Sequence, residues 1–344
     1  MSSTAESKDQ LQSYARPRLG RSLLDLATSV VPYLLLTALM YATWGDSIWL
    51  TLGLLLPTSG FLLRTFIVFH DCGHGSFLPS KRANRWVGRL TALLVWQPYE
   101  NWRFDHAVHH GTAGDLDRRG TGDVHTLTVA EFNATDARGR LAYRLFRNPF
   151  VMFGVGPLYA LMLQPRVIPR SAKPRIQRSI LGTDIALAIV VGVLCWLIGW
   201  QAYLLVQLPP FLIGGAAGVF LFYVQHQFED TYWERKPDWT FAESALHGSS
   251  HLKLAQPLQF FTGNIGLHHV HHLNARIPNY NLQRAHDENP VFHDVPTLTL
   301  RAAARSVRLK LWDEDAGRLV TFAEARPSRP LRRPRTTPAS RQSG

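Results

Sequence analysis

The chain alternates between long apolar stretches and strongly polar segments. Lys and Arg are absent between Arg21 and Arg64 and again between Arg178 and Arg235, and both gaps are largely apolar. A helix needs about 20 apolar residues to cross a bilayer, so each gap has room for two crossings. We therefore predict four membrane-spanning helices, at about 26–44, 48–69, 180–200 and 203–224.

These helices are expected to form two hairpins with very short turns. The turns, at residues 45–47 and 199–201, carry no basic residue, whereas Lys and Arg are frequent in the other segments. The positive-inside rule then predicts that both termini, the 70–178 segment and everything after residue 225 are cytoplasmic. The alternative is four buried helices of a soluble protein, which rarely lack basic residues over such lengths.

The remaining segments complete the expected architecture. Two shorter apolar stretches, 87–96 and 150–163, are predicted to be helices lying in the membrane interface, with extra short spans as the alternative. We expect an all-α protein, in which four transmembrane helices carry a cytosolic helical cap. The expected divisions are a polar N-terminal tail (1–22), a membrane domain (23–310) and a basic, Pro- and Arg-rich tail (311–344) that is at least partly disordered.

Charge and cysteine content narrow the possible functions. The formal net charge of +12 suggests a nucleic acid, a membrane surface or an acidic partner. Because the basic residues flank apolar spans, we favour the membrane and expect no nucleic-acid partner. The two cysteines, Cys72 and Cys195, exclude a disulfide framework, and thiolates cannot be the main ligands of a metal site.

Most of the 15 histidines lie in segments on the predicted cytoplasmic side, two of them directly at the inner ends of spans. Residues three or four apart share one face of a helix, so HxxxH and HxxHH patterns gather imidazoles on that face. These patterns occur in FHDCGHGSF, DHAVHHG and GNIGLHHVHHLNARIPNYNL, and YVQHQFED adds one more histidine. The nine candidate ligands are His70, His74, His106, His109, His110, His226, His268, His271 and His272.

Nine imidazoles are too many for one metal ion and suit two, because a transition metal takes roughly four to six ligands. Structural zinc sites usually include thiolates. An all-nitrogen ligand set that leaves a position open instead favours a redox metal that binds oxygen.

The other histidines are weaker candidates. His269 is expected to pack behind the ligands, although a pairing of His269 with His272 remains possible. His247 and His251 have helical spacing, but the Gly and Ser residues between them are poor helix formers. The remaining three, taken as ordinary surface histidines, are His125, His286 and His293.

The segments HDCGH, HAVHH and GNIGLHHVHHLNARIPNYNL resemble the three histidine boxes of the integral-membrane fatty acid desaturases. RTFIVFHDCGHGSF and FYVQHQFEDTYW are similar to the delta-12 or omega-6-like acyl-lipid branch, and the resemblance covers about 60–290. It implies an enzyme that introduces a cis double bond into a membrane-embedded acyl chain. It also implies O2 as co-substrate and a non-haem di-iron centre in the cap, held by the nine histidines, with no further catalytic residue.

The resemblance further implies the partners: membrane lipids, an acyl-lipid or acyl-thioester substrate, and an external electron donor. That donor would be ferredoxin, flavodoxin or a cytochrome b5-type protein. It is expected to be a separate protein because the HPGG motif of relatives with a fused cytochrome b5 domain does not occur in this sequence. Stearoyl-type relatives have an asparagine four residues before the ligand that ends the fourth span. Here that position is Phe222, so a water-bridging role is not carried over.

Two other functions compete with this interpretation. A fatty acyl hydroxylase, or a desaturase of another lipid chain, would use the same scaffold, because one oxidant can insert a hydroxyl or remove a second hydrogen. A divalent-metal transporter is a remote alternative, because transport needs polar ligands at mid-membrane depth. The predicted spans and their ends offer few ionisable residues beyond Asp25, Asp184 and Arg64.

Charged neighbours of the boxes are candidates for supporting roles. Asp71, Asp105 and Glu229 lie close in sequence to predicted ligands, and each is expected either to accept a hydrogen bond from a ligand ring or to be a solvated or structural carboxylate. Arg64, near the inner end of the second span, is expected to extend toward lipid headgroups.

Overall fold

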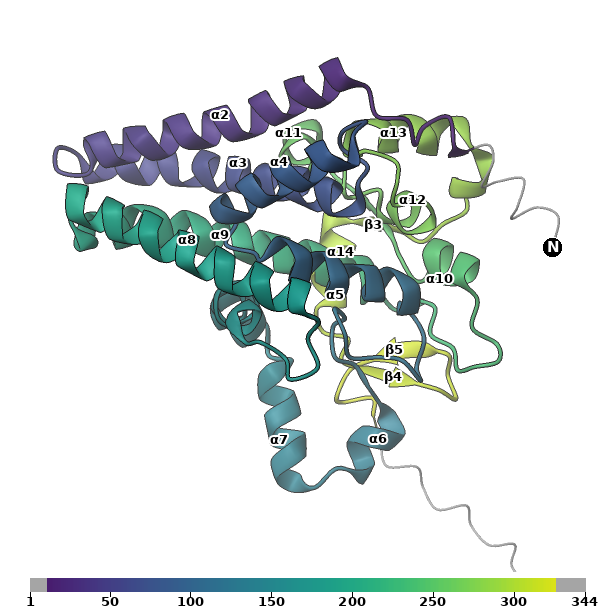
Figure 1. Ribbon diagram of the computed structural model, residues 1–344. Coiled ribbons are helices and arrows are strands. Elements are labelled where there is room, and N and C mark those ends of the chain that lie inside the picture. Colours follow the sequence, from purple (N-terminus) through teal and green to yellow (C-terminus); the bar gives the residue numbers. More distant parts are fainter. Residues whose placement is uncertain (1–10, 326–344) are drawn as a thin grey trace, which may run out of the picture.

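Four long helices dominate the computed structural model, which describes residues 11–325 (Figure 1). Each is long and apolar enough to cross a membrane, and within the described residues these are the helices with that property. The four predicted spans are therefore confirmed as helices, with slightly different ends. They are α2 (Leu19–Thr43), α3 (Ile48–His74), α8 (Pro174–Ile198) and α9 (Trp200–His226).

The two hairpins turn at the same end of the bundle (Figure 1). Ser47 caps α3 by accepting a hydrogen bond from the Leu50 N–H, and Gly75 ends the helix in a left-handed conformation with φ of 69°. The helices leave many apolar side chains uncovered, among them Trp49 and Trp196, which are 80% and 83% exposed. Apolar side chains on this scale are the surface that a bilayer would cover.

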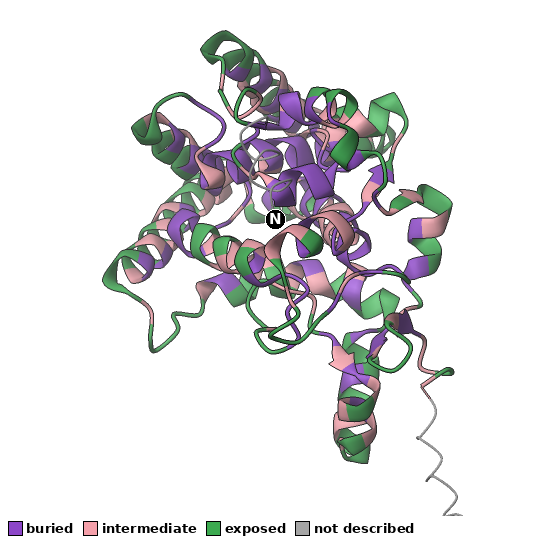
Figure 2. Ribbon diagram, turned by 90° about the vertical axis from the view of Figure 1, so that its right-hand side faces the viewer, coloured by how far each residue is buried: buried purple, intermediate pink, exposed green. Residues whose placement is uncertain are grey.

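Shorter elements gather round the other end of the bundle, with α4 lying along α3 (Figure 1). Viewed from that end, buried residues concentrate in its interior (Figure 2). The shorter α-helices of the described residues are α4 (Lys81–Leu94), α5 (Tyr99–Thr112), α6 (Val129–Ala134), α7 (Ala137–Phe146), α10 (Phe241–His247), α11 (Gln256–Phe261), α12 (His268–Leu273), α13 (Asn279–Glu288) and α14 (Leu300–Ser306).

The two shorter apolar stretches are helical, as predicted. Residues 87–94 belong to α4, and residues 151–163 form two π-helical segments, η1 (Val151–Val155) and η2 (Leu158–Leu163). Single 3₁₀ turns follow at η3 (Gln164–Arg166) and later at η4 (Pro290–Phe292). Their position in the membrane interface stays a prediction.

Two small sheets tie distant segments of the cap together. The first has the order β1 (Leu127–Thr128), β4 (Leu311–Asp313), β5 (Arg318–Val320), with β1 parallel to β4 and β4 antiparallel to β5. The second pairs β2 (His251–Lys253) with β3 (Thr297–Thr299) in parallel. The fold therefore continues to at least Val320, beyond the expected boundary at residue 310. Part of the expected N-terminal tail is also folded, because Leu11 is buried and α2 begins at Leu19. Residues 1–10 and 326–344 lie outside the described residues.

Arg64 departs from the sequence prediction. Its side chain is buried and donates hydrogen bonds to the Asp25 carboxylate and to the Phe260 carbonyl, instead of extending to headgroups. The guanidinium also lies 4.0 Å from the centre of the Phe260 ring. The other Asp25 oxygen accepts from Asn279 Nδ2 at 2.9 Å. A buried ion pair thus joins α2 to α3, and the contacts to Phe260 and Asn279 tie both helices to the cap.

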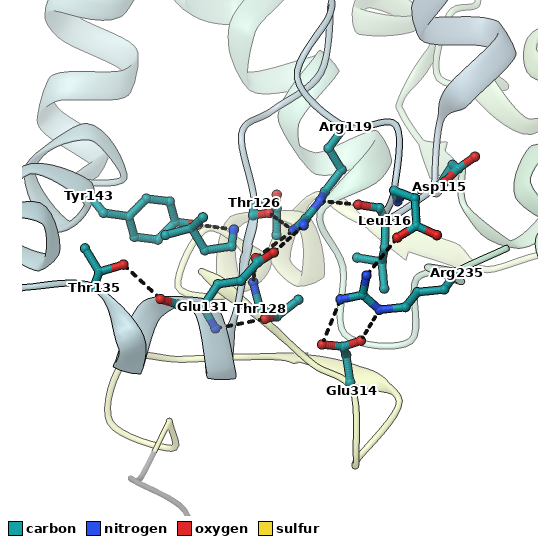
Figure 3. A network of polar contacts seen from close by, with 12 residues as sticks. Asp115, Leu116, Arg119, Thr126, Thr128, Glu131, Thr135, Tyr143, Arg235 and Glu314 are labelled. Atoms are coloured by element: carbon teal, nitrogen blue, oxygen red, sulfur yellow. Dashed lines mark hydrogen bonds and ion pairs between the residues drawn. The ribbon is translucent and has the colours of Figure 1, made fainter.

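A polar network holds the loop between α5 and α6 (Figure 3). Arg119 donates to the carbonyls of Leu116 and Thr126, both at 2.7 Å, and to the Glu131 carboxylate at 2.5 and 2.9 Å. The two carbonyls lie on either side of Asp123 in the sequence. Arg119 therefore fixes both ends of the stretch that carries this carboxylate.

Candidate metal centre

The nine histidines predicted as ligands meet at the cap end of the bundle. Two come from the last turns of α3, three from α5, one from the end of α9 and three from α12. They form two tetrads, in each of which every histidine offers one ring nitrogen within 4.8 Å of the others. The first tetrad is His70, His74, His106 and His271, and the second is His109, His226, His268 and His272.

Close packing of α3 against α5 brings the first two boxes together. The Trp102 ring stacks on His106, with the ring centres 4.4 Å apart. A Cβ atom at Gly73 would lie 2.6 Å from the Trp102 ring, closer than real side chains approach. Glycine within the HDCGH segment therefore permits the contact that places His106 beside His70.

His110 lies between the tetrads. Its Nε2 is 3.2 Å from His106 Nε2 in the first tetrad, and its ring stacks on His272 of the second at 4.1 Å. The ninth imidazole is therefore positioned to serve either tetrad.

Several ring nitrogens point at one another in a way that favours a cation between them. The Nε2 atoms of His226 and His268 are 2.9 Å apart, and those of His109 and His226 are 3.2 Å apart. A neutral imidazole has one N–H and one lone pair. Because His226 Nδ1 donates to the Gly248 carbonyl at 3.0 Å, its Nε2 lone pair faces the other rings. Metal-ligating histidines are typically oriented in this way.

Other buried ring nitrogens have no hydrogen-bond partner among the described residues, among them Nε2 of His74, His271 and His272. Buried polar atoms without partners are rare in folded proteins and call for an explanation. Burial, and then neighbouring imidazoles, hold the pKa of five rings well below the usual range: His106, His110, His268, His271 and His272. Neutral rings with free lone pairs suit two transition-metal ions.

The carboxylates beside the site match the sequence prediction in part. Asp71 accepts from His70 Nδ1 at 3.0 Å, as predicted. Asp105 instead accepts from Asn101 at 3.3 Å, and Glu229 pairs with Arg318 at 2.9 Å, so these two carboxylates take the alternative, structural role.

Asp123 is the carboxylate that the sequence analysis missed. Its Oδ1 lies 2.5 Å from His109 Nδ1. Asp123 comes 14 residues after His109, in a loop that folds back on α5. No helical spacing connects the two residues, so the sequence carries no local signal for the contact.

Phe222 covers the second tetrad from the side of α9. Its ring centre is 5.0 Å from that of His109 and 5.4 Å from that of His226. A cavity of about 10 Å³ lies beside these three residues, close to the space that one water needs. An apolar ring, rather than a polar side chain, thus faces the second tetrad from this side.

The histidines outside the nine match the sequence predictions only in part. His125 is exposed, as predicted. His247 ends α10 while His251 begins β2, so this pair does not share a helix face. His286 is half-buried beside His269, and its assignment as an isolated surface residue is wrong.

Comparison with known proteins adds the family. A family model for fatty acid desaturases matches residues 47–299. The chain belongs to the fatty acid desaturase family. A protein named fatty acid desaturase from Bacillus subtilis (strain 168) is 44% identical over 313 residues, which cover 91% of this desaturase and 89% of that relative.

More distant relatives have more specific names. An sn-1 acyl-lipid omega-3 desaturase (ferredoxin) from Synechocystis sp. is 29% identical over 231 residues, covering 64% of this chain and 62% of the relative. An sn-1 oleoyl-lipid 12-desaturase from the same organism is 28% identical over 226 residues, covering 65% and 64%. The protein is therefore an oxidoreductase acting on acyl chains, with four apolar helices typical of a membrane protein. Neither the hydroxylase nor the transporter is favoured.

Proposed function

We propose that this desaturase uses O2 and two iron ions, held by the nine histidines, to introduce a cis double bond into the acyl chain of a membrane lipid. The observation that supports this most is the convergence of two histidine tetrads at the ends of apolar helices. Their unpartnered nitrogens and facing lone pairs suit metal ions. Zinc sites usually include thiolates, whereas an all-imidazole set fits iron that must also bind oxygen.

The reaction removes one hydrogen from each of two adjacent methylene groups. O2 is reduced to two waters, with two electrons and two protons from the acyl chain and the same number from the donor and solvent. No side chain can oxidise an unactivated methylene, so the irons, when bound, supply that chemistry.

The chain's own residues hold the irons and set their surroundings. The first tetrad would bind one iron and the second tetrad the other, with His110 completing either. Asp71 and Asp123 keep the Nδ1 protons of His70 and His109 in place, so that the Nε2 atoms of both rings remain available as ligands.

The substrate and donor follow from the relatives and the fold. Two relatives are named as acyl-lipid desaturases that use ferredoxin, and we extend an acyl-lipid substrate to this chain. An external donor of the ferredoxin, flavodoxin or cytochrome b5 type would deliver electrons to the cap. The positive-inside rule supports a cytoplasmic location for the cap and both termini, where such donors are available.

Fatty-acid analysis after expression tests this function. The wild type should add a double bond to host acyl chains, detected by mass spectrometry of their methyl esters. His271→Ala removes a ligand of the first tetrad and should abolish the new product and lower bound iron, while leaving the amount of membrane-inserted protein unchanged. His125→Ala, at an exposed histidine, is the matched control and should stay active. Full activity of His271→Ala would show the ligand assignment to be wrong.

A further inference from the structure

Four arginines converge on one buried carboxylate beside the membrane-spanning helices. Glu100, at the start of α5, is 5% exposed, and its oxygens lie 2.5 Å from the Arg175 guanidinium and 3.4 Å from that of Arg89. Arg103 and Arg85 approach the same carboxylate to 3.8 and 3.9 Å. We call Arg85, Arg89, Arg103 and Arg175 the arginine cluster. Its members come from three helices, α4, α5 and α8.

The arginine cluster carries more positive charge than its partner neutralises. Four guanidinium groups face one carboxylate, and in the described part of the chain no other carboxylate forms an ion pair with them. The four arginine side chains are 46–52% exposed, so they can reach a ligand at the surface. Like charges held this close repel one another, and an anion between them would relieve the repulsion.

Two of the helices that carry the cluster change from basic to apolar just beyond it. In α4 the Lys and Arg residues end at Arg89, and residues 90–95 are uncharged. In α8 they end at Arg178, and the exposed side chains that follow include Ile185. Because Arg89 and Arg175 contact the same carboxylate, both changes occur at one level of the bundle. A bilayer surface is expected at that level, since basic side chains extend to headgroups and apolar ones face the lipid interior.

Exposed apolar side chains flank the cluster on α4. Trp86 and Leu90 are 55% and 64% exposed, and the Arg89 guanidinium lies 5.7 Å from the centre of the Trp86 ring. Tryptophan is enriched where membranes meet water, and amphipathic helices bury such apolar side chains among the headgroups. A lipid offers a phosphate to the arginines and acyl chains to the apolar side chains, whereas an acidic protein surface matches the arginines alone.

We propose that the arginine cluster binds the phosphate of one anionic glycerophospholipid in the leaflet on the cap side. Guanidinium groups bind phosphate oxygens through paired hydrogen bonds, and basic pockets between membrane helices bind lipid headgroups. Glu100 would hold the four arginines together from the buried side, and the phosphate would compensate them from the exposed side. The acyl chains would lie against the exposed apolar side chains of α8.

Lipid binding by the purified full-length enzyme tests this proposal. Native mass spectrometry counts the lipids bound to the enzyme in detergent while phosphatidylglycerol or phosphatidylcholine is titrated. The wild type should hold about one phosphatidylglycerol per chain at concentrations at which phosphatidylcholine does not bind.

Removing two arginines of the cluster should weaken this binding. The double variant Arg89→Gln with Arg175→Gln should bind phosphatidylglycerol roughly 30-fold more weakly, because two of the attracting charges are lost. Arg85 and Arg103 still face Glu100 in this variant, so the buried carboxylate keeps its partners. Arg89→Gln alone, at a half-exposed side chain, should weaken binding roughly fivefold.

A matched control and a competitor make the result decisive. Arg301→Gln with Arg305→Gln removes the same charge from exposed positions of α14 and should bind phosphatidylglycerol like the wild type. Equal elution volumes and helical circular dichroism would show that all variants fold. The proposal fails if the wild type shows no preference for phosphatidylglycerol, if the cluster variants bind it as the control does, or if glycerol 3-phosphate at the same concentration displaces it. Equal lipid binding by all variants, with an acidic ferredoxin binding to the wild type and control alone, would instead make the cluster a protein docking surface and overturn the proposal.

Discussion

At the scale of single residues, the second nitrogen of each ring decides how an imidazole faces the candidate metal centre. His70 is oriented by Asp71, the next residue, whereas His109 is oriented by a carboxylate from a loop and His226 by a backbone carbonyl. Only the first of these partners is a neighbour in the sequence. The three rings are thus oriented by three kinds of partner, namely an adjacent side chain, a side chain from a loop and a backbone carbonyl. The last two partners come close to their rings only when the chain has folded.

Asp123→Asn tests the loop partner. The amide keeps the shape of the side chain but removes the charge that favours the Nδ1–H tautomer of His109. We expect iron affinity to fall by roughly 10- to 100-fold with little change in protein yield. The measurement is iron retained per chain during dialysis against a chelator. Asp105→Asn, whose carboxylate contacts Asn101 instead, is the control and should retain iron. Equal retention by both variants would contradict the role of Asp123.

At the scale of elements, a buried ion pair connects the first hairpin to the cap. Arg64 in α3 contacts both Asp25 in α2 and the backbone of α11. Removing one member of a buried pair leaves an uncompensated charge, whereas replacing both with apolar residues is often neutral.

A double-mutant cycle tests this pair. Arg64→Leu or Asp25→Leu alone should lower the free energy of unfolding by about 3–5 kcal/mol, because each leaves one charge buried without its partner. The double variant should recover most of that loss, even though Asn279 loses its contact with Asp25. The measurement is the free energy of unfolding of each variant in mixed detergent micelles. Additive losses in the double variant would show that the two charges do not compensate each other.

The elements also show how far sequence reasoning reaches. The four spans were predictable because a membrane helix needs a long uncharged run, which is a local property of the sequence. The tetrads were largely predictable because HxxxH and HxxHH fix relative positions within one helix. The strands were not, because β1 and β4 are two and three residues long and pair across most of the chain.

At the scale of the whole molecule, the cap encloses many imidazoles that stay neutral. Burial lowers the pKa of His106, His268 and His271 well below 6.5 in the folded chain. In the unfolded chain these rings would take up protons near pH 6.5. The unfolded state therefore binds more protons in acid, and the stability from neutral burial is complete above about pH 6.5 and is lost as the pH falls below it.

The melting temperature of metal-free enzyme should follow this dependence. We expect it to be nearly constant above about pH 7 and to fall steadily below about pH 6.5. Bound metal requires neutral imidazole and competes with protons, so the metal-loaded enzyme should hold its melting temperature to a lower pH. Thermal unfolding of both forms across this range is the measurement. A metal-free melting temperature that does not change between about pH 7.5 and about pH 5.5 would contradict the expectation.

The pairing of β1 with β4 bears on the order of events during biosynthesis. β1 follows the loop that carries Asp123, and its partner strand begins at Leu311, near the end of the described chain. A ribosome releases the first two histidine boxes long before it releases β4. While translation continues, β1 lacks its partner strand, and the contacts of Arg119 are the ones that hold the Asp123 loop. Completion of the candidate metal centre is a late step for a second reason, because the three histidines of α12 follow both hairpins in the sequence.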